Sequence, residues 1–107
     1  MRSSASFVAV PDFIFISVDS DKLLADKRLT IDVAGVRVTL PLRGIVYGGG
    51  AHFVCRFISK RGRVWYHDGI VTGSRCVDDG WLKNVRDPRW LMSTRTREAV
   101  LLVYARR

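Results

Sequence analysis

Alternating apolar and polar residues between Thr30 and Leu40 constrain the fold of this chain more than any other feature. Apolar side chains recur at every second position on both sides of Ala34-Gly35, and a period of two places them on one face of an extended strand. Glycine adopts the positive φ of a tight turn without steric cost. The stretch therefore predicts a β-hairpin with one apolar and one solvent-facing side, which Pro41 is expected to end.

Other segments also have strand patterns. Residues 13–18 are apolar on both alternating faces, which predicts a central strand buried on both sides. Four more strands are expected at residues 42–47, 52–58, 63–67 and 98–105. A short helix is expected around Trp81-Leu82, before Pro88. We therefore predict a mainly β (α+β) fold, an antiparallel sheet of about six or seven strands with one short helix.

The length and composition fit one folded domain. A chain of 107 residues with a hydrophobic fraction of 48% can bury a core, so we expect residues 1–107 to form a single domain in which residues 1–10 are flexible. No apolar run approaches the ~20 residues of a membrane span. Residues 1–6 lack the apolar stretch of a secretory signal. We therefore expect an intracellular protein, in the cytoplasm or nucleus, that does not contact a membrane.

Cys55 and Cys76 are the two cysteines of the chain. Neither belongs to a CxxC pair or to a Cys/His cluster with zinc-ligand spacing. The acid pair Asp78-Asp79 is attractive for a metal ion but has no third ligand. The sequence therefore predicts no metal site and no cofactor. In a reducing compartment both cysteines are expected to be free thiols.

Positive charge is concentrated in the second half of the chain. The net charge is +8, of which residues 1–54 carry +1 and residues 55–107 carry +7. A basic surface attracts polyanions, which suggests a noncatalytic β-sheet interaction module that binds nucleic acid or an acidic protein. A solvated surface that keeps the protein soluble, or one that faces an acidic neighbour, would explain the same charge. The chain has no run of consecutive basic residues that would favour nucleic acid.

A glycine-rich segment precedes His52. Gly48, Gly49 and Gly50 carry no side chains, so a thin substrate chain could approach the imidazole there. One hairpin later the returning strand ends at Asp68, and the outer ends of two antiparallel strands lie side by side. We therefore expect Asp68 within hydrogen-bonding reach of His52, accepting the Nδ1–H of the ring as the acid of a catalytic triad does. Taken alone, His52 is also explained as a sheet histidine satisfied by hydrogen bonds.

The order of these segments resembles that of a known family. Along the chain come residues 11–18, residues 42–47, Ala51-His52-Phe53, Trp65-Tyr66-His67-Asp68 and residues 99–106. In this order the chain resembles the C-terminal, histidine-bearing half of a ubiquitin-specific protease domain, a papain-like cysteine peptidase. The resemblance covers residues 11–107 and implies the sheet lobe of that fold. Ala-His-Phe replaces the family's Gly-His-Tyr, and the tryptophan-to-aspartate segment is one residue shorter than in the family.

The resemblance implies a deubiquitinase-type function. His52 and Asp68 would be the histidine and the acid of a Cys-His-Asp triad. The three glycines would pass the narrow tail of ubiquitin or a ubiquitin-like protein, and Trp65 would contact that substrate. The family's nucleophilic cysteine lies far upstream, and nothing before Pro11 resembles its segment. We therefore expect a fragment, pseudo-enzyme or binding remnant that is inactive alone. One feature opposes ubiquitin binding, because the arginines of the ubiquitin tail and the basic half of this chain would repel each other.

Neither cysteine is expected to replace the missing nucleophile. Cys55 follows His52 by three residues, so it points to the opposite strand face, where we expect it in the core with Phe53 and Phe57. Cys76 lies after His52, whereas the family's nucleophile precedes its histidine. A stand-alone hydrolase that uses Cys76 with His52 is therefore the last of three hypotheses.

A sheet lobe alone would leave the wall of its catalytic cleft uncovered. Four residues are expected to line this wall or to lie just beneath it: Ile45, Tyr47, Phe53 and Trp65. Monomeric soluble proteins rarely expose large contiguous apolar patches. We therefore expect self-association, a complementary N-terminal half as partner, or low stability.

Overall fold

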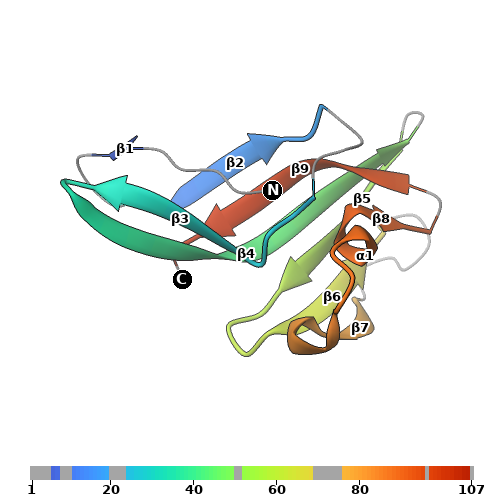
Figure 1. Cartoon of the computed structure of the whole chain (residues 1–107). Coiled ribbons are helices and arrows are strands. Elements are labelled where there is room, and N and C mark those ends of the chain that lie inside the picture. Colours follow the sequence, from blue (N-terminus) through green and yellow to red (C-terminus); the bar gives the residue numbers. More distant parts are fainter. Residues whose placement is uncertain are drawn as a thin grey trace.

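The computed structural model describes residues 6–7, 11–19, 24–49, 52–68, 76–95 and 97–106, so the expected flexibility of residues 1–10 falls mostly outside them. In this part of the chain nine strands join in one sheet (Figure 1). The strands are β1 Ser6–Phe7, β2 Phe13–Ser17, β3 Arg28–Val33, β4 Val36–Gly49, β5 His52–Ile58, β6 Arg63–His67, β7 Val77–Trp81, β8 Ser93–Thr94 and β9 Arg97–Ala105. A 3-10 turn, η1 Leu82–Asn84, and one short helix, α1 Arg89–Met92, complete the fold. The predicted class, a mainly β antiparallel sheet with one short helix, is confirmed.

The strand order is β1-β3-β4-β5-β6-β7, and β9 pairs with β2, β4 and β8. Every pair is antiparallel except β1 with β3. The sheet has more strands than the six or seven that we expected because β1 and β8 have two residues each and β7 lies where a helix was expected.

β4 joins the two parts of the sheet (Figure 1). Its first part pairs with β3 around the predicted turn at Ala34-Gly35, and its second part pairs with β5 and β9. The expected stop at Pro41 is wrong, because the strand runs on to Gly49. Pro41 is the last β4 residue paired with β3, and Leu42 is the first paired with β9. A residue without a backbone N–H thus lies where β4 exchanges one partner strand for another.

The core lies on one face of the sheet. The segment that carries η1 and α1 packs against this face through Leu82, Trp90, Leu91 and Met92, and Ala25 joins it from the chain before β3. The largest fully buried side chains are Tyr47, Tyr104, Ile31, Leu40, Leu42, Ile45, Leu91, Leu102 and Val64. Each such leucine or isoleucine stabilises the fold by about 1.5–3 kcal/mol relative to an exposed one.

The opposite face carries exposed aromatic side chains. Phe13, Phe15 and Phe53 are 59%, 63% and 61% exposed, and the rings of Phe13 and Phe15 stack 6.2 Å apart. Phe57 shares this face, since its register partners are Gly44 on β4 and Trp65 on β6. Among the described residues, nothing covers these phenylalanines, and the expected self-association stays a prediction.

Two sequence predictions about burial are wrong. β2 is not a central strand buried on both sides, because the described strands offer it one partner, β9, and its outward residues are exposed. Apolar residues on both faces therefore mark an edge strand with one uncovered face. Ile45 and Tyr47 were expected to line an uncovered wall or to lie just beneath it, but they are 1% and 0% exposed and belong to a core that the segment carrying η1 and α1 covers.

The segment after β6 departs most from expectation. The short helix was expected within residues 78–87, but residues 77–81 form β7 and pair with β6. The 3-10 turn η1 follows, and Pro88 caps the start of α1 where we expected it to end a helix. Neither η1 nor α1, the helical segments of the described chain, has the length and apolar character needed to cross a membrane.

Candidate functional site

His52 and Asp68 are brought together at one end of the β5–β6 hairpin. Cys55 is paired with His67, so Asp68, the next residue, lies on the same face as His52. His52 Nε2 and Asp68 Oδ1 are 2.8 Å apart. The side chains are 25% and 6% exposed, respectively. The predicted proximity is therefore observed, but Nε2 faces the carboxylate where Nδ1 was expected.

This geometry assigns the protons of the imidazole. An ionised carboxylate only accepts hydrogen bonds, so Nε2 must carry the hydrogen that it donates to Asp68. In the neutral ring Nδ1 is then the basic nitrogen, and the described residues place no hydrogen-bond partner on it. A buried acid that fixes the tautomer and stabilises the imidazolium is the arrangement in which a histidine takes up a proton from a substrate or nucleophile.

Tyr66 forms a hydrogen bond with the second oxygen of the Asp68 carboxylate. Its hydroxyl donates to Asp68 Oδ2 over 3.4 Å, and both side chains are buried. Burial raises the pKa of the Tyr66 hydroxyl, and the neighbouring charge of Asp68 adds to the effect. Tyr66 therefore stays a neutral donor at physiological pH. Sequence reasoning missed this residue, although alternation along β6 places it two residues before Asp68 on the same face.

The glycines before His52 do not form the open loop that was expected. Gly48 and Gly49 are the last residues of β4 and pair with Phe53 and His52, respectively. Gly48 is overlaid by a ring, because a Cβ built on it would lie 2.9 Å from Cε1 of Phe53. Gly49 is the register partner of His52, so the β4 residue beside the imidazole is one without a side chain. Gly50 lies outside the described residues.

Trp65 and the two cysteines are on the other face of the sheet. Trp65 is paired with Phe57, one position out of phase with the residues that share the face of His52. Cys55 is opposite His67 on that same outer face, as predicted, but it is half-buried and is not in the core. Burial raises the pKa of the Cys55 thiol, and nearby Cys76 adds to the effect. Cys76 is exposed, and both cysteines are free.

A buried charge network lies next to the pair and was not predicted. Arg56 is 4% exposed and donates from Nε to Asp79 Oδ2 over 2.9 Å. Its Nη1 donates to the carbonyl oxygens of Trp90 and Ser93 and to the hydroxyl of Tyr47. Its guanidinium also lies 3.6 Å from the centre of the Trp90 ring. The strand that begins with His52 is thereby anchored to the α1 segment.

Asp79 is shared between two arginines. Arg95 donates to both of its carboxylate oxygens, over 3.0 and 2.9 Å, and lies over the Tyr66 ring at 3.6 Å. Burial alone would raise the pKa of Asp79, but the hydrogen bonds and charges of Arg95 and Arg56 outweigh it and hold that pKa below its ordinary value. A continuous chain of contacts therefore runs from His52 through Asp68, Tyr66, Arg95 and Asp79 to Arg56.

A bulge in β7 directs Asp79 into this network. Val64 pairs with Gly80 and Trp65 pairs with Asp78, which leaves Asp79 as the extra residue between them. Such a bulge re-aims a side chain, and Gly80 takes the positive φ of +97° that follows it. One signal could have revealed the network from sequence, since Arg56 falls on the same alternating positions as the buried Val54 and Ile58. A charge at an inward position of a strand requires a buried partner.

Among the described residues no group of three or more histidine, cysteine, aspartate or glutamate side chains is arranged to hold a metal ion. The candidate site is therefore the pair His52–Asp68, supported by Tyr66, with Gly49 as the β4 residue beside His52. Comparison of the chain with protein-family models, with curated proteins and with solved structures found no match.

Proposed function

We propose that this chain supplies the histidine and aspartate of a cysteine-peptidase site of the ubiquitin-specific protease type, and that it binds the tail of ubiquitin or a ubiquitin-like protein. The observation that carries the proposal is the 2.8 Å contact between His52 Nε2 and the buried carboxylate of Asp68. A sheet histidine that is merely satisfied by hydrogen bonds does not need a buried acid with its own supporting hydroxyl. The order of segments that resembles the family adds to this support.

In the proposed site, His52 is the proton carrier. Its Nδ1 would take the proton from a cysteine thiol, and Asp68 would stabilise the resulting imidazolium through Nε2–H. His52 would then return the proton to the leaving amine. The thiol has to come from elsewhere, because Cys55 lies on the far face of the sheet and the exposed Cys76 lies near Cys55. The chain would thus supply half of the catalytic site: it would orient the ubiquitin tail and provide His52 as the base.

Binding of the ubiquitin tail tests this proposal. We expect titration with ubiquitin to shift the amide and imidazole resonances of His52 and the amide of Gly49, because the tail would pass between them. His52→Ala should weaken the complex about tenfold through the lost contact. His67→Ala is the matched control, since His67 is the other histidine of the same hairpin on the opposite face, and it should leave the affinity unchanged.

Ubiquitin that lacks its last two glycines provides the second control for the same titration. It should leave the His52 and Gly49 resonances where they are. Equal shifts with intact and truncated ubiquitin, or equal affinities for the His52→Ala and His67→Ala variants, would show that the His52–Asp68 pair does not bind the ubiquitin tail. Either result would refute the proposal.

A second prediction concerns covalent chemistry. The protein alone should form no adduct with ubiquitin that carries a C-terminal electrophile, because Cys55 lies on the face opposite His52 and Cys76 lies near Cys55. Intact-mass spectrometry after overnight incubation checks this. An adduct that is lost in Cys76→Ala but kept in Cys55→Ala would contradict the proposal and would favour a hydrolase that uses Cys76.

A further inference from the structure

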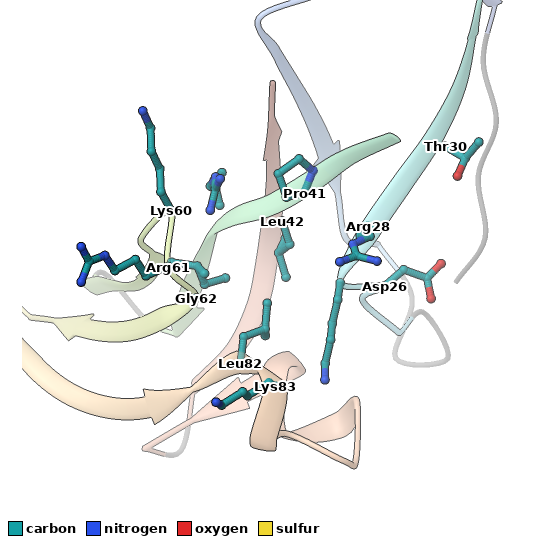
Figure 2. Close-up of a pocket in the computed structure, with 13 residues that line it drawn as sticks. Asp26, Arg28, Thr30, Pro41, Leu42, Lys60, Arg61, Gly62, Leu82 and Lys83 are labelled. Atoms are coloured by element: carbon teal, nitrogen blue, oxygen red, sulfur yellow. The ribbon is translucent and has the colours of Figure 1, made fainter. Parts of the chain in front are cut away.

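A second feature lies at the other end of the β5–β6 hairpin. A pocket of about 840 Å³ opens between the start of β3, the middle of β4, the β5–β6 turn and η1 (Figure 2). Six basic residues and one acidic residue, Asp26, are among those that line it. The basic residues are Lys27, Arg28, Arg43, Lys60, Arg61 and Lys83. Three of them come from the first half of the chain, whose net charge is small. The fold therefore brings together basic residues that are far apart in the sequence.

The walls of this basic pocket are tied together by hydrogen bonds. Leu42 N donates to Lys27 O over 2.9 Å, which joins β4 to the start of β3. Leu82 N donates to Gly62 O over 2.8 Å, which joins η1 to the β5–β6 turn. Lys27 Nζ donates to Val85 O over 2.7 Å and closes the remaining side. The pocket is therefore preformed, and a ligand would not have to order it.

Among the described residues that line the pocket, Asp26 is the one carboxylate against six cations. In the described chain none of the six cations is ion-paired with a carboxylate. Arginines outside the pocket differ, because five of them are ion-paired: Arg56, Arg63, Arg89, Arg95 and Arg106. Cations gathered in a concave surface without counter-charges raise the local potential and attract anions.

Arg43 adds an unsatisfied donor. Its Nη1 donates to the carbonyl oxygen of Ser59 over 2.8 Å, which holds the guanidinium at the wall of the pocket. Its Nε is buried, and the described residues offer it no hydrogen-bond acceptor. A buried donor without an acceptor costs stability unless an acceptor is supplied. Arg43 also contributes its positive charge at the wall of the pocket.

We propose that the basic pocket binds a compact anion that carries several phosphate groups. Figure 2 shows Lys60 and Arg61 on one side and Arg28 on the other, with Leu42 and Leu82 directed toward each other between them. In Figure 2 the charged ends of Lys60 and Arg61 are directed away from Arg28, so these long side chains would turn toward the hollow to meet phosphates clustered on a small scaffold. The volume is within the range of small-molecule sites. None of the described lining residues is aromatic, so the pocket has no surface on which a nucleic-acid base would stack.

This site is independent of the proposed peptidase function. His52 and Ile58 are the two ends of β5, which places the pocket about 20 Å from the imidazole at the rise of an extended strand. A ligand in the pocket would therefore lie at the opposite end of the hairpin from His52.

Calorimetric titration with inositol hexakisphosphate as the probe tests the proposal, with sulfate at matched ionic strength as the single-anion control. We expect the probe to bind at least a hundredfold more tightly than sulfate, and Arg43→Gln to weaken it by about tenfold or more, as for loss of one charged hydrogen-bond donor. The double variant Lys60→Gln/Arg61→Gln, in an exposed turn, should weaken it similarly and should keep the wild-type melting temperature. It decides the matter if Arg43→Gln does not fold.

Arg89→Gln/Arg106→Gln is the matched control, because it removes the same charge from ion-paired positions outside the pocket. It should change the affinity by less than about twofold, because the charges of these exposed residues are screened by solvent and already paired with Asp87 and Asp12. Equal losses in both double variants would mean that net charge attracts the probe, and the site would be refuted. A contrary result would be that single-stranded RNA or vesicles with anionic lipids bind more tightly than inositol hexakisphosphate and lose this binding in the pocket variants. That result would overturn the proposal of a compact ligand and would assign the pocket to RNA or to a membrane surface.

Discussion

Asparagine at position 79 is expected to lower the free energy of unfolding by about 3 kcal/mol, one of the two largest effects in this protein. The substitution keeps the shape of the side chain and removes its charge. Arg56 would then remain 4% exposed without a counter-ion, and Arg95 would lose one of the two carboxylate oxygens that accept its hydrogen bonds. Urea unfolding of Asp79→Asn and wild type measures the difference.

Asp78→Asn is the matched control, one residue away. Asp78 pairs with Arg63, but both side chains are about one-third exposed, at 38% and 34%. Exposed ion pairs contribute less than about 1 kcal/mol, so this variant should stay close to wild type. If both substitutions lower the stability equally, Arg56 does not depend on Asp79, and the buried network is not what holds β5 to the α1 segment.

The same pair of variants has a defined pH dependence. The pKa of Asp79 lies below its ordinary value of 3.8 in the folded protein, so its ionised form stabilises the fold above that value. The contribution is lost as the pH falls through the lowered pKa, where wild type also carries a neutral side chain. The stability difference between Asp79→Asn and wild type should therefore shrink below about pH 4.

Strict alternation made part of the fold predictable. The hairpin around Ala34-Gly35, the strands that carry His52 and Asp68, and the last strand all lie where a period of two indicated them. The contact between His52 and Asp68 followed from the same logic, because a short turn fixes which residues meet at the end of a hairpin. Register alone was sufficient, and no long-range information was needed.

The errors occurred where pairing partners are distant in sequence. Residues 13–18 looked doubly buried, but whether another layer covers Phe13 and Phe15 depends on the rest of the fold. The role of Pro41 depends on β9, which joins β4 from the far end of the chain. The β-bulge that turns Asp79 toward Arg56 interrupts the period of two, so alternation of apolar and polar residues could not predict it. The basic pocket was hidden for the same reason, because four separate segments supply its cations.

The other large effect is expected at high pH. Burial raises the pKa of Tyr47 to about 12 and that of Tyr104 to about 12, from an ordinary value of 10.0. Both rings are 0% exposed. A raised pKa in the folded state means that stability is complete below pH 10 and is lost as the pH rises toward 12. Two units correspond to roughly 2.7 kcal/mol for each tyrosine, and the pair together reaches the whole stability of a marginal small domain.

Tyr104→Phe separates this effect from the deprotonation of lysines. The variant loses the hydrogen bond from the hydroxyl to the carbonyl oxygen of Asp26, 2.6 Å long, and should be about 1 kcal/mol less stable than wild type at pH 8. Between pH 10 and 12 it should lose about half as much stability as wild type, because one ionisable buried hydroxyl is gone while every lysine is kept. The two stability curves should therefore cross in this range. Urea unfolding at pH 8, 10 and 11.5 measures both curves, and parallel curves would mean that the buried tyrosines do not set the alkaline limit of the fold.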